Sequence, residues 1–137
     1  MKNLHIRDRR VGQVTILDIE GNLRIGEGSA ELQKAIRRLL AEGQNQILLN
    51  LAQVAYIDSS GLGEMVAAHV ATGKSGGEIK LLHLTQRVRE LMTITKLVTV
   101  FESYETEMGA LDSYKREVEG MEEEVGEEAK VAQGVGR

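Results

Sequence analysis

The sequence contains no cysteine and no proline, and aromatic residues make up only 3% of its 137 residues. Without cysteine the chain has no disulfide framework, no thiolate nucleophile and no cysteine-ligated metal site. The scarcity of aromatic rings removes the stacking platform that single-stranded nucleic acids usually require. The composition therefore excludes cysteine chemistry and argues against single-strand binding by stacking.

Long apolar stretches are also missing. The longest apolar runs are about five residues, far below the roughly 20 that a transmembrane helix needs. The N-terminal residues 1–5 lack the apolar region of a signal peptide. At 137 residues, 42% hydrophobic and 28% charged, the chain has the length of one domain with a single core. We expect a cytoplasmic globular protein without membrane insertion.

The net charge of −4 is concentrated at the C-terminal end. Residues 1–111 carry thirteen basic and thirteen acidic side chains, whereas residues 112–137 carry four basic and eight acidic ones. The neutral body lacks the basic stripe of a nucleic-acid-binding protein, so we expect no direct contact with nucleic acid. The change in composition after Val118 predicts a domain over residues 1–118 and an acidic tail over residues 119–137, which is expected to be flexible.

Apolar spacing near the C-terminus leaves a second interpretation of the tail open. If the last helix continues into the tail, one of its faces carries Leu111, Tyr114, Val118, Met121 and Val125. Such a helix could pack on a second copy of the chain and make the protein a homodimer.

The hydrophobic pattern predicts an α/β fold. Alternating residues predict an antiparallel hairpin that turns at residues 11–13. Uninterrupted apolar runs predict strands covered on both faces, at residues 46–51, 79–84 and 97–101. Together with the helices below, this order implies a mixed β-sheet of about five strands with about four helices packed against it.

Helical spacing places a helix after each of the later loops. The expected helices run from Ser29, as N-cap, to Gly43; from the 58–63 stretch to about Thr72; over residues 86–95 after a Thr85 cap; and from about Ser103 or Thr106. The second helix is expected to bury Leu62, Met65, Val66, His69 and Val70. The last is expected to bury Met108, Leu111 and Val118.

The stretch Asp58-Ser59-Ser60-Gly61-Leu62-Gly63 lies where an apolar strand has ended and a helix begins. We call this stretch, Asp58–Gly63, the corner. Backbone N–H groups at a helix start lack intrahelical partners, and the macrodipole is positive there, so the corner is a favourable place for negative charge. Each of the two glycines costs roughly 1 kcal/mol of helix stability relative to alanine. They indicate close approach of a neighbour, either another part of the fold or another molecule.

Motifs for cofactor binding are incomplete. Gly73-Lys74-Ser75 resembles the end of a phosphate-binding loop, but Ala68 replaces the first glycine and the motif follows a helix. Gly61-Leu62-Gly63 lacks the third glycine of a dinucleotide fingerprint. No pair of the three histidines has ligand spacing: His5, His69 and His83. We expect no metal and no cofactor.

The corner could also belong to a serine hydrolase, with Ser59 as the nucleophile. The Gly-x-Ser-x-Gly elbow is absent, however, and the sequence places no histidine to act as its base. From the residues alone Ser59 is a helix-capping hydroxyl, and we expect no enzymatic activity.

The corner and its surroundings resemble the signature of STAS domains, specifically those of bacterial anti-anti-sigma factors, which are also called anti-sigma factor antagonists. The resemblance extends from about Leu4 to Leu111. It rests on the following segments: Gly21-Asn22-Leu23, Ile47–Leu51, Tyr56-Ile57, Asp58–Gly63, Gly76-Gly77-Glu78, Leu91-Met92 and Val98–Phe101.

The resemblance implies a regulator of transcription that is itself a phosphoprotein. Ser59 would be phosphorylated by a partner that is both an anti-sigma factor and a serine protein kinase of the GHKL ATPase type. The unphosphorylated protein would bind this kinase and free the sigma factor, phosphorylation would prevent binding, and a serine phosphatase would reset the cycle. The implied partner-binding residues are Asp58, Ser60, Gly61, Leu62, Gly63 and Arg24.

Two features depart from the family pattern. Arg24 stands where family members carry an acidic residue, in a loop that neighbours the phosphorylation corner, and could change the choice of kinase or pair with a phosphate. The acidic tail from Glu117 is an addition to the usual domain. These departures keep a second function open, that of a STAS scaffold subunit in a larger signalling or lipid-transport complex, where Ser59 only caps the helix.

Overall fold

The first two strands form the predicted hairpin. In the computed structural model, which describes residues 4–115, β1 (Leu4–Val11) and β2 (Val14–Leu23) pair antiparallel. The two-residue turn between them places Gly12 at φ 63°, a left-handed conformation that glycine adopts without a Cβ clash. The hairpin leaves β2 in position to accept the next strand on its other side.

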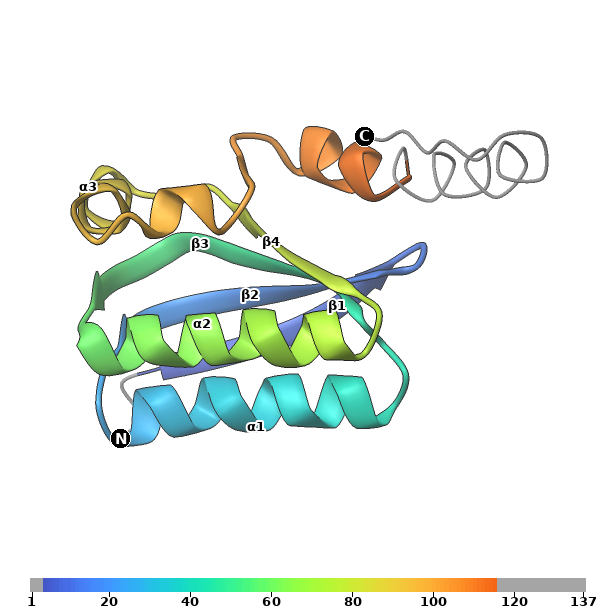
Figure 1. Cartoon of the computed structure of the whole chain (residues 1–137), viewed down its shortest axis with the longest axis horizontal. Coiled ribbons are helices and arrows are strands. Elements are labelled where there is room, and N and C mark those ends of the chain that lie inside the picture. Colours follow the sequence, from blue (N-terminus) through green and yellow to red (C-terminus); the bar gives the residue numbers. More distant parts are fainter. Residues whose placement is uncertain (1–3, 116–137) are drawn as a thin grey trace.

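The remaining strands are parallel to β2 and extend the sheet away from the hairpin (Figure 1). They are β3 (Gln46–Ile57), β4 (Glu78–Leu82) and β5 (Ser103–Tyr104). The strand order is β1-β2-β3-β4-β5. The predicted mixed sheet of about five strands is therefore confirmed, with β3 six residues longer at its carboxyl end than its apolar run indicated.

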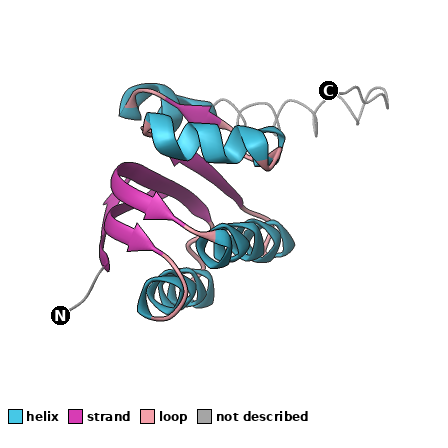
Figure 2. Ribbon diagram, turned by 90° about the vertical axis from the view of Figure 1, so that its left-hand side faces the viewer, coloured by secondary structure: helices cyan, strands magenta, loops and turns pink. Residues whose placement is uncertain are grey.

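Helices lie on both faces of this sheet. α1 (Glu27–Ala41) and α2 (Ser59–Lys74) run side by side against one face (Figures 1 and 2). A C-terminal helix, residues 107–115 of the described chain, covers the opposite face. α3 (Gln86–Ile94), capped by Thr85 as predicted, packs near the carboxyl end of β3.

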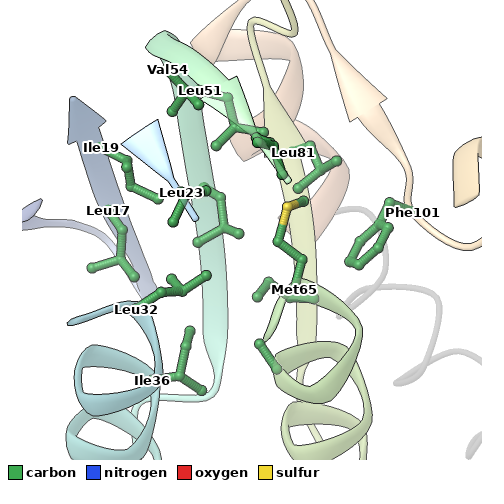
Figure 3. Close-up of a cluster of buried hydrophobic side chains, with 14 of the residues drawn as sticks. Leu17, Ile19, Leu23, Leu32, Ile36, Leu51, Val54, Met65, Leu81 and Phe101 are labelled. Carbon is green, nitrogen blue, oxygen red and sulfur yellow. The ribbon is translucent and has the colours of Figure 1, made fainter. Parts of the chain in front are cut away.

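The two faces of the sheet bury separate apolar clusters. The larger joins the sheet to α1, α2 and α3 and includes Leu17, Leu32, Met65, Leu81 and Phe101 (Figure 3). The smaller joins Ile16 and Leu48 to Tyr114 of the C-terminal helix. Because successive residues of β2 and β3 point to opposite faces, strands buried on both sides need apolar residues at nearly every position. This explains their uninterrupted apolar runs.

Two basic side chains of the sheet, Arg9 and Lys80, form polar contacts with the C-terminal helix. Arg9 of β1 forms ion pairs with Asp18 of β2 at 2.6 Å and with Glu107 at the start of the helix at 2.8 Å. Lys80 is fully buried beneath the helix, where its Nζ donates to Ser113 Oγ at 2.8 Å and lies 3.2 Å from Glu102 Oε1. The ion pair of Arg9 with Glu107 and the hydrogen bond of Lys80 with Ser113 therefore link the sheet to the helix in addition to the apolar contacts.

The predicted strand at residues 97–101 is wrong. Residues Leu97–Thr99 form a short 3₁₀ helix, η1, preceded by Lys96 at φ 65°, and the sheet is joined only at Ser103. Val98 and Val100 are about 40% exposed, whereas Phe101 is buried. The chain must return from α3 to the edge of β4 before it can pair, so this apolar run forms a surface connection instead of a strand.

Three helix details also differ from expectation. α1 begins at Glu27 with Gly26 as N-cap, and Ser29 Oγ donates instead to the carbonyl of Arg24. α2 buries Ala68 and Thr72, whereas Val70 is 48% exposed. In the C-terminal helix Met108 is 81% exposed, because the face toward the sheet carries Ala110 and Tyr114.

Some expectations fall outside residues 4–115. These are the position of Val118, the boundary between the domain and the acidic tail, and the helical extension through Met121 and Val125 that would support a homodimer. Within the described residues, each helix is too short or too polar to cross a membrane.

The C-terminal helix should contribute strongly to stability through Tyr114. This side chain is 3% exposed and its hydroxyl donates to the carbonyl of Ile47. We expect Tyr114→Ala to lower the free energy of unfolding by about 3 kcal/mol or more, because a large buried ring and its hydrogen bond are lost. Met108→Ala on the same helix should change it by less than about 0.5 kcal/mol. Equal effects in urea denaturation would show that this helix does not cover the sheet.

Candidate functional site

The side chain of Asp58 joins two loops at the start of α2. Its Oδ1 accepts the backbone N–H of Gly61 at 2.9 Å, and its Oδ2 accepts the backbone N–H of Ile25 at 3.0 Å. The backbone N–H of Asp58 donates to the carbonyl of Leu23 at 3.1 Å. The loop after β2 is thus held against the loop after β3, as the sequence resemblance implied.

These hydrogen bonds keep Asp58 ionised. The backbone donors of Ile25 and Gly61 hold the pKa of this carboxyl below its ordinary value, with smaller help from the backbone of Ser60 and the charge of Arg24, while partial desolvation opposes them. The N-cap of α2 is therefore a carboxylate placed at the positive end of the helix macrodipole. The prediction that Ser59 caps the helix is therefore wrong: Asp58 is the cap, and Ser59 is the first residue of α2.

The space around the two glycines of the motif, Gly61 and Gly63, differs. A Cβ on Gly61 would lie 2.2 Å from the carbonyl oxygen of Leu23, so this glycine is required by the fold itself. A Cβ on Gly63 would meet nothing within 4 Å, and the residue is exposed. Of the two glycines, only Gly63 lies at the protein surface, where its missing side chain leaves space for another molecule.

Solvent exposure differs among the two serines and Leu62. Ser59 is exposed, Ser60 is half-buried and Leu62 is 6% exposed. Within residues 4–115 the Ser59 hydroxyl makes no side-chain hydrogen bond, so its oxygen is accessible and unengaged. The buried side chain of Leu62 packs in the larger apolar cluster and anchors the start of α2.

A groove of about 600 Å³ opens beside Ser59, between the start of α2 and α3. Its residues are Tyr56, Ile57, Asp58, Ser59, Leu62, Arg87, Val88, Glu90, Leu91, Ile94 and Thr95. Ile94 is 77% exposed at its rim, and the guanidinium of Arg87 lies 5.7 Å from the centre of the Tyr56 ring. The groove thus combines exposed apolar surface with the positive charge of Arg87, whose guanidinium group lies over the Tyr56 ring.

The loop after β2 flanks the corner on another side. Arg24 and Ile25 are both exposed, Ile25 to 76%. The fold therefore brings Arg24 to the same surface as Ser59, whereas Tyr56, Arg87 and Ile94 join them without having been predicted. The resemblance includes Tyr56 only as part of the segment before the corner, and no local pattern marks Arg87 or Ile94. Packing of α3 near the end of β3 brings the three side chains to one groove.

The structure offers no imidazole to activate Ser59. None of the three histidines lines the groove within the described part of the chain, and His69 instead packs edge-on against Phe101 at 5.2 Å between ring centres. The Ser–His pair typical of serine hydrolases is therefore not formed in this groove by the residues that the structure describes.

The contrast between the two glycines can be tested by alanine substitution. Gly61→Ala should lower the free energy of unfolding by about 2 kcal/mol, because the new Cβ forces the helix away from Leu23. Gly63→Ala should raise it by up to about 1 kcal/mol, because alanine is the better helix former and nothing obstructs it. Urea denaturation measures both, and a Gly61→Ala variant as stable as Gly63→Ala would contradict the close approach.

Asp58 should make stability depend on pH. Because its folded pKa is lowered, its contribution is present at neutral pH and is lost as the pH falls through the folded pKa. We expect Asp58→Asn to be less stable than the wild type near pH 7, and the difference to shrink toward about pH 3. A difference that stays constant across this range, measured by urea denaturation, would show that ionisation of Asp58 is irrelevant to the fold.

Comparisons with known proteins identify the family of the chain. Residues 5–110 match the model of the STAS domain family. An anti-sigma-B factor antagonist of Staphylococcus epidermidis is 33% identical over 67 residues, which are 49% of this chain and 62% of the relative's length. The matched part thus spans less than two thirds of that relative.

Solved structures show the same fold. A crystal structure from Thermotoga maritima, described as an anti-sigma factor antagonist, is 28% identical with a TM-score of 0.71, and the match covers 79% of this chain and 92% of that one. A sulfate transporter family protein from Wolinella succinogenes is 20% identical with a TM-score of 0.68, covering 80% and 90%; this likeness concerns the fold alone. Because the family model matches more than half of its residues, the chain belongs to the STAS domain family.

Proposed function

We propose that this protein is an anti-sigma factor antagonist that acts by binding, and that phosphorylation of Ser59 switches it off. The observation that carries the proposal is the exposed, unengaged Ser59 hydroxyl at the start of α2, beside a groove with an apolar rim. The similarity to anti-sigma factor antagonists supports it. The binding surface would be formed by Asp58, Ser59, Ser60, Gly63 and Arg24 over the buried support of Gly61 and Leu62.

The covalent step belongs to the partner, an anti-sigma factor that is also a GHKL-type serine kinase. The Ser59 oxygen attacks the γ-phosphorus of ATP, its hydroxyl proton is released, and ADP leaves. A serine phosphatase reverses the modification when water attacks the phosphoserine, which regenerates the hydroxyl and releases inorganic phosphate. This protein contributes the nucleophilic oxygen and its accessible position, and no catalytic group.

The fold tolerates the modification. A phosphoryl group adds about two negative charges, and at Ser59 these would lie at the N-terminus of α2, where the helix macrodipole favours anions. The helix is already closed by Asp58, so the new group need not break a cap. Phosphorylation should therefore change the surface and leave the fold intact.

The same charge would prevent docking. It would stand at the centre of the binding surface, beside the ionised Asp58 and next to the apolar rim formed by Ile94. A partner that buries this rim would have to desolvate a dianion, which is costly unless the partner supplies matching cations. Binding is lost while the domain stays folded.

Substitutions at Ser59 test the switch against purified GHKL-type serine kinases encoded in the same genome. We expect Ser59→Ala to bind its kinase whether or not ATP is present, and Ser59→Asp to bind at least about tenfold more weakly, measured by calorimetry. Ser60→Ala is the matched control and should remain a substrate. The idea fails if Ser59→Asp binds every kinase as tightly as the wild type does.

A STAS scaffold subunit of a larger signalling or lipid-transport complex is the alternative, favoured by the unexpected Arg24 at the corner. It predicts that incubation with these kinases and ATP leaves no stoichiometric phosphate on Ser59. Mass spectrometry of the intact chain distinguishes the two, because one phosphoryl group per chain, absent from Ser59→Ala, is expected only of the switch.

A further inference from the structure

Two arginines near Ser59 form no ion pair with any residue that the structure describes. Arg24 follows β2 and its charge acts on Asp58, while Arg87 belongs to α3 and lines the groove that Ser59 borders. Both are exposed, and within residues 4–115 neither forms a salt bridge. By contrast, Arg9 and Arg38 elsewhere on the surface do form salt bridges.

The carboxylates of this surface are already engaged. The two oxygens of Asp58 accept the backbone N–H groups of Gly61 and Ile25. Glu90, the other acidic residue of the groove, accepts the side-chain amide of Gln86 at 3.1 Å. The surface therefore offers free guanidinium donors, whereas its own acidic groups are used within the fold.

Exposed apolar side chains accompany these cations on the same loops and helix. Ile25 is 76% exposed, Ile94 is 77% exposed and Tyr56 is 39% exposed. We call this combined surface the arginine-flanked face: Arg24, Ile25, Tyr56, Ser59, Arg87 and Ile94. Arginine and aromatic residues beside exposed apolar side chains are the composition of a protein-binding surface.

We propose that the partner of the arginine-flanked face is acidic at its edge, with carboxylates that pair with Arg24 and Arg87 around an apolar contact on Ile25 and Ile94. This deepens the proposed function and rests on it. A guanidinium matches a carboxylate with two parallel hydrogen bonds. Stacking on Tyr56 holds Arg87 in place, so less conformational entropy is lost when the pair forms.

The same arrangement explains how a phosphate on Ser59 would act. The phosphoryl oxygens would lie at the rim of the groove that Arg87 lines, where they compete with the partner's carboxylates for the guanidinium group. The modification then removes the cation that the partner needs and adds repulsion toward acidic residues. The loss of the cation and the added repulsion both weaken binding to the acidic partner.

Charge reversal tests this inference with the kinase that binds the unphosphorylated full-length protein. Arg24→Glu and Arg87→Glu should each weaken binding at least about tenfold, and the wild-type affinity should fall as salt is raised from about 50 to about 500 mM. Arg37→Glu, an exposed position on α1, is the matched control and should bind as the wild type does. Urea denaturation of all three variants shows whether the fold is retained.

The outcomes separate this inference from the switch. If Ser59→Asp abolishes binding but both arginine variants bind as tightly as the wild type or more tightly, the switch stands and the acidic partner is excluded. If the Ser59 substitutions have no effect, the proposed function itself fails. Restored binding of Arg87→Glu to a kinase variant with one surface carboxylate replaced by lysine would identify the pairing residue and establish the inference.

Discussion

The carboxylate of Asp58 is the contact on which the arrangement of the candidate site depends. It caps α2 through Gly61 and at the same time holds the loop after β2 through Ile25, so one side chain fixes two segments that are more than thirty residues apart. Gly61 allows the helix to approach Leu23 closely enough for both bonds to form. An ionised cap is stronger than a hydroxyl cap in this position, because the charge also interacts with the helix macrodipole.

The sheet supplies the rigid base for that contact. β3 carries apolar residues on both faces and therefore leads to the corner from the centre of the molecule, with α1 and α2 on one side and the C-terminal helix on the other. Loops at the carboxyl ends of buried parallel strands are held at their base and exposed at their tip. This combination suits a site that must present a hydroxyl to another protein in a constant orientation.

The charges at the corner support the proposed role in protein binding. Asp58 is ionised and fully used in the fold, Ser59 is accessible without a base, and Arg24 and Arg87 are exposed cations. A surface of this kind changes its partner preference by a large amount when a dianion is added, since every nearby charge responds to it. The proposed regulation needs no movement of the backbone.

The sequence by itself determined the elements that depend on local patterns: the hairpin around Gly12, the two-sided strands, the Thr85 cap and the corner from Asp58 to Gly63. It did not determine features set by distant contacts, because a run of apolar residues has the same pattern whether it is buried or not. The 97–101 run was therefore mistaken for a strand, and Met108 for a core residue. The family resemblance had already placed Arg24 beside the corner. Only the tertiary structure decided that Arg87, 28 positions after Ser59, shares this surface, since packing of α3 near the end of β3 brings it there.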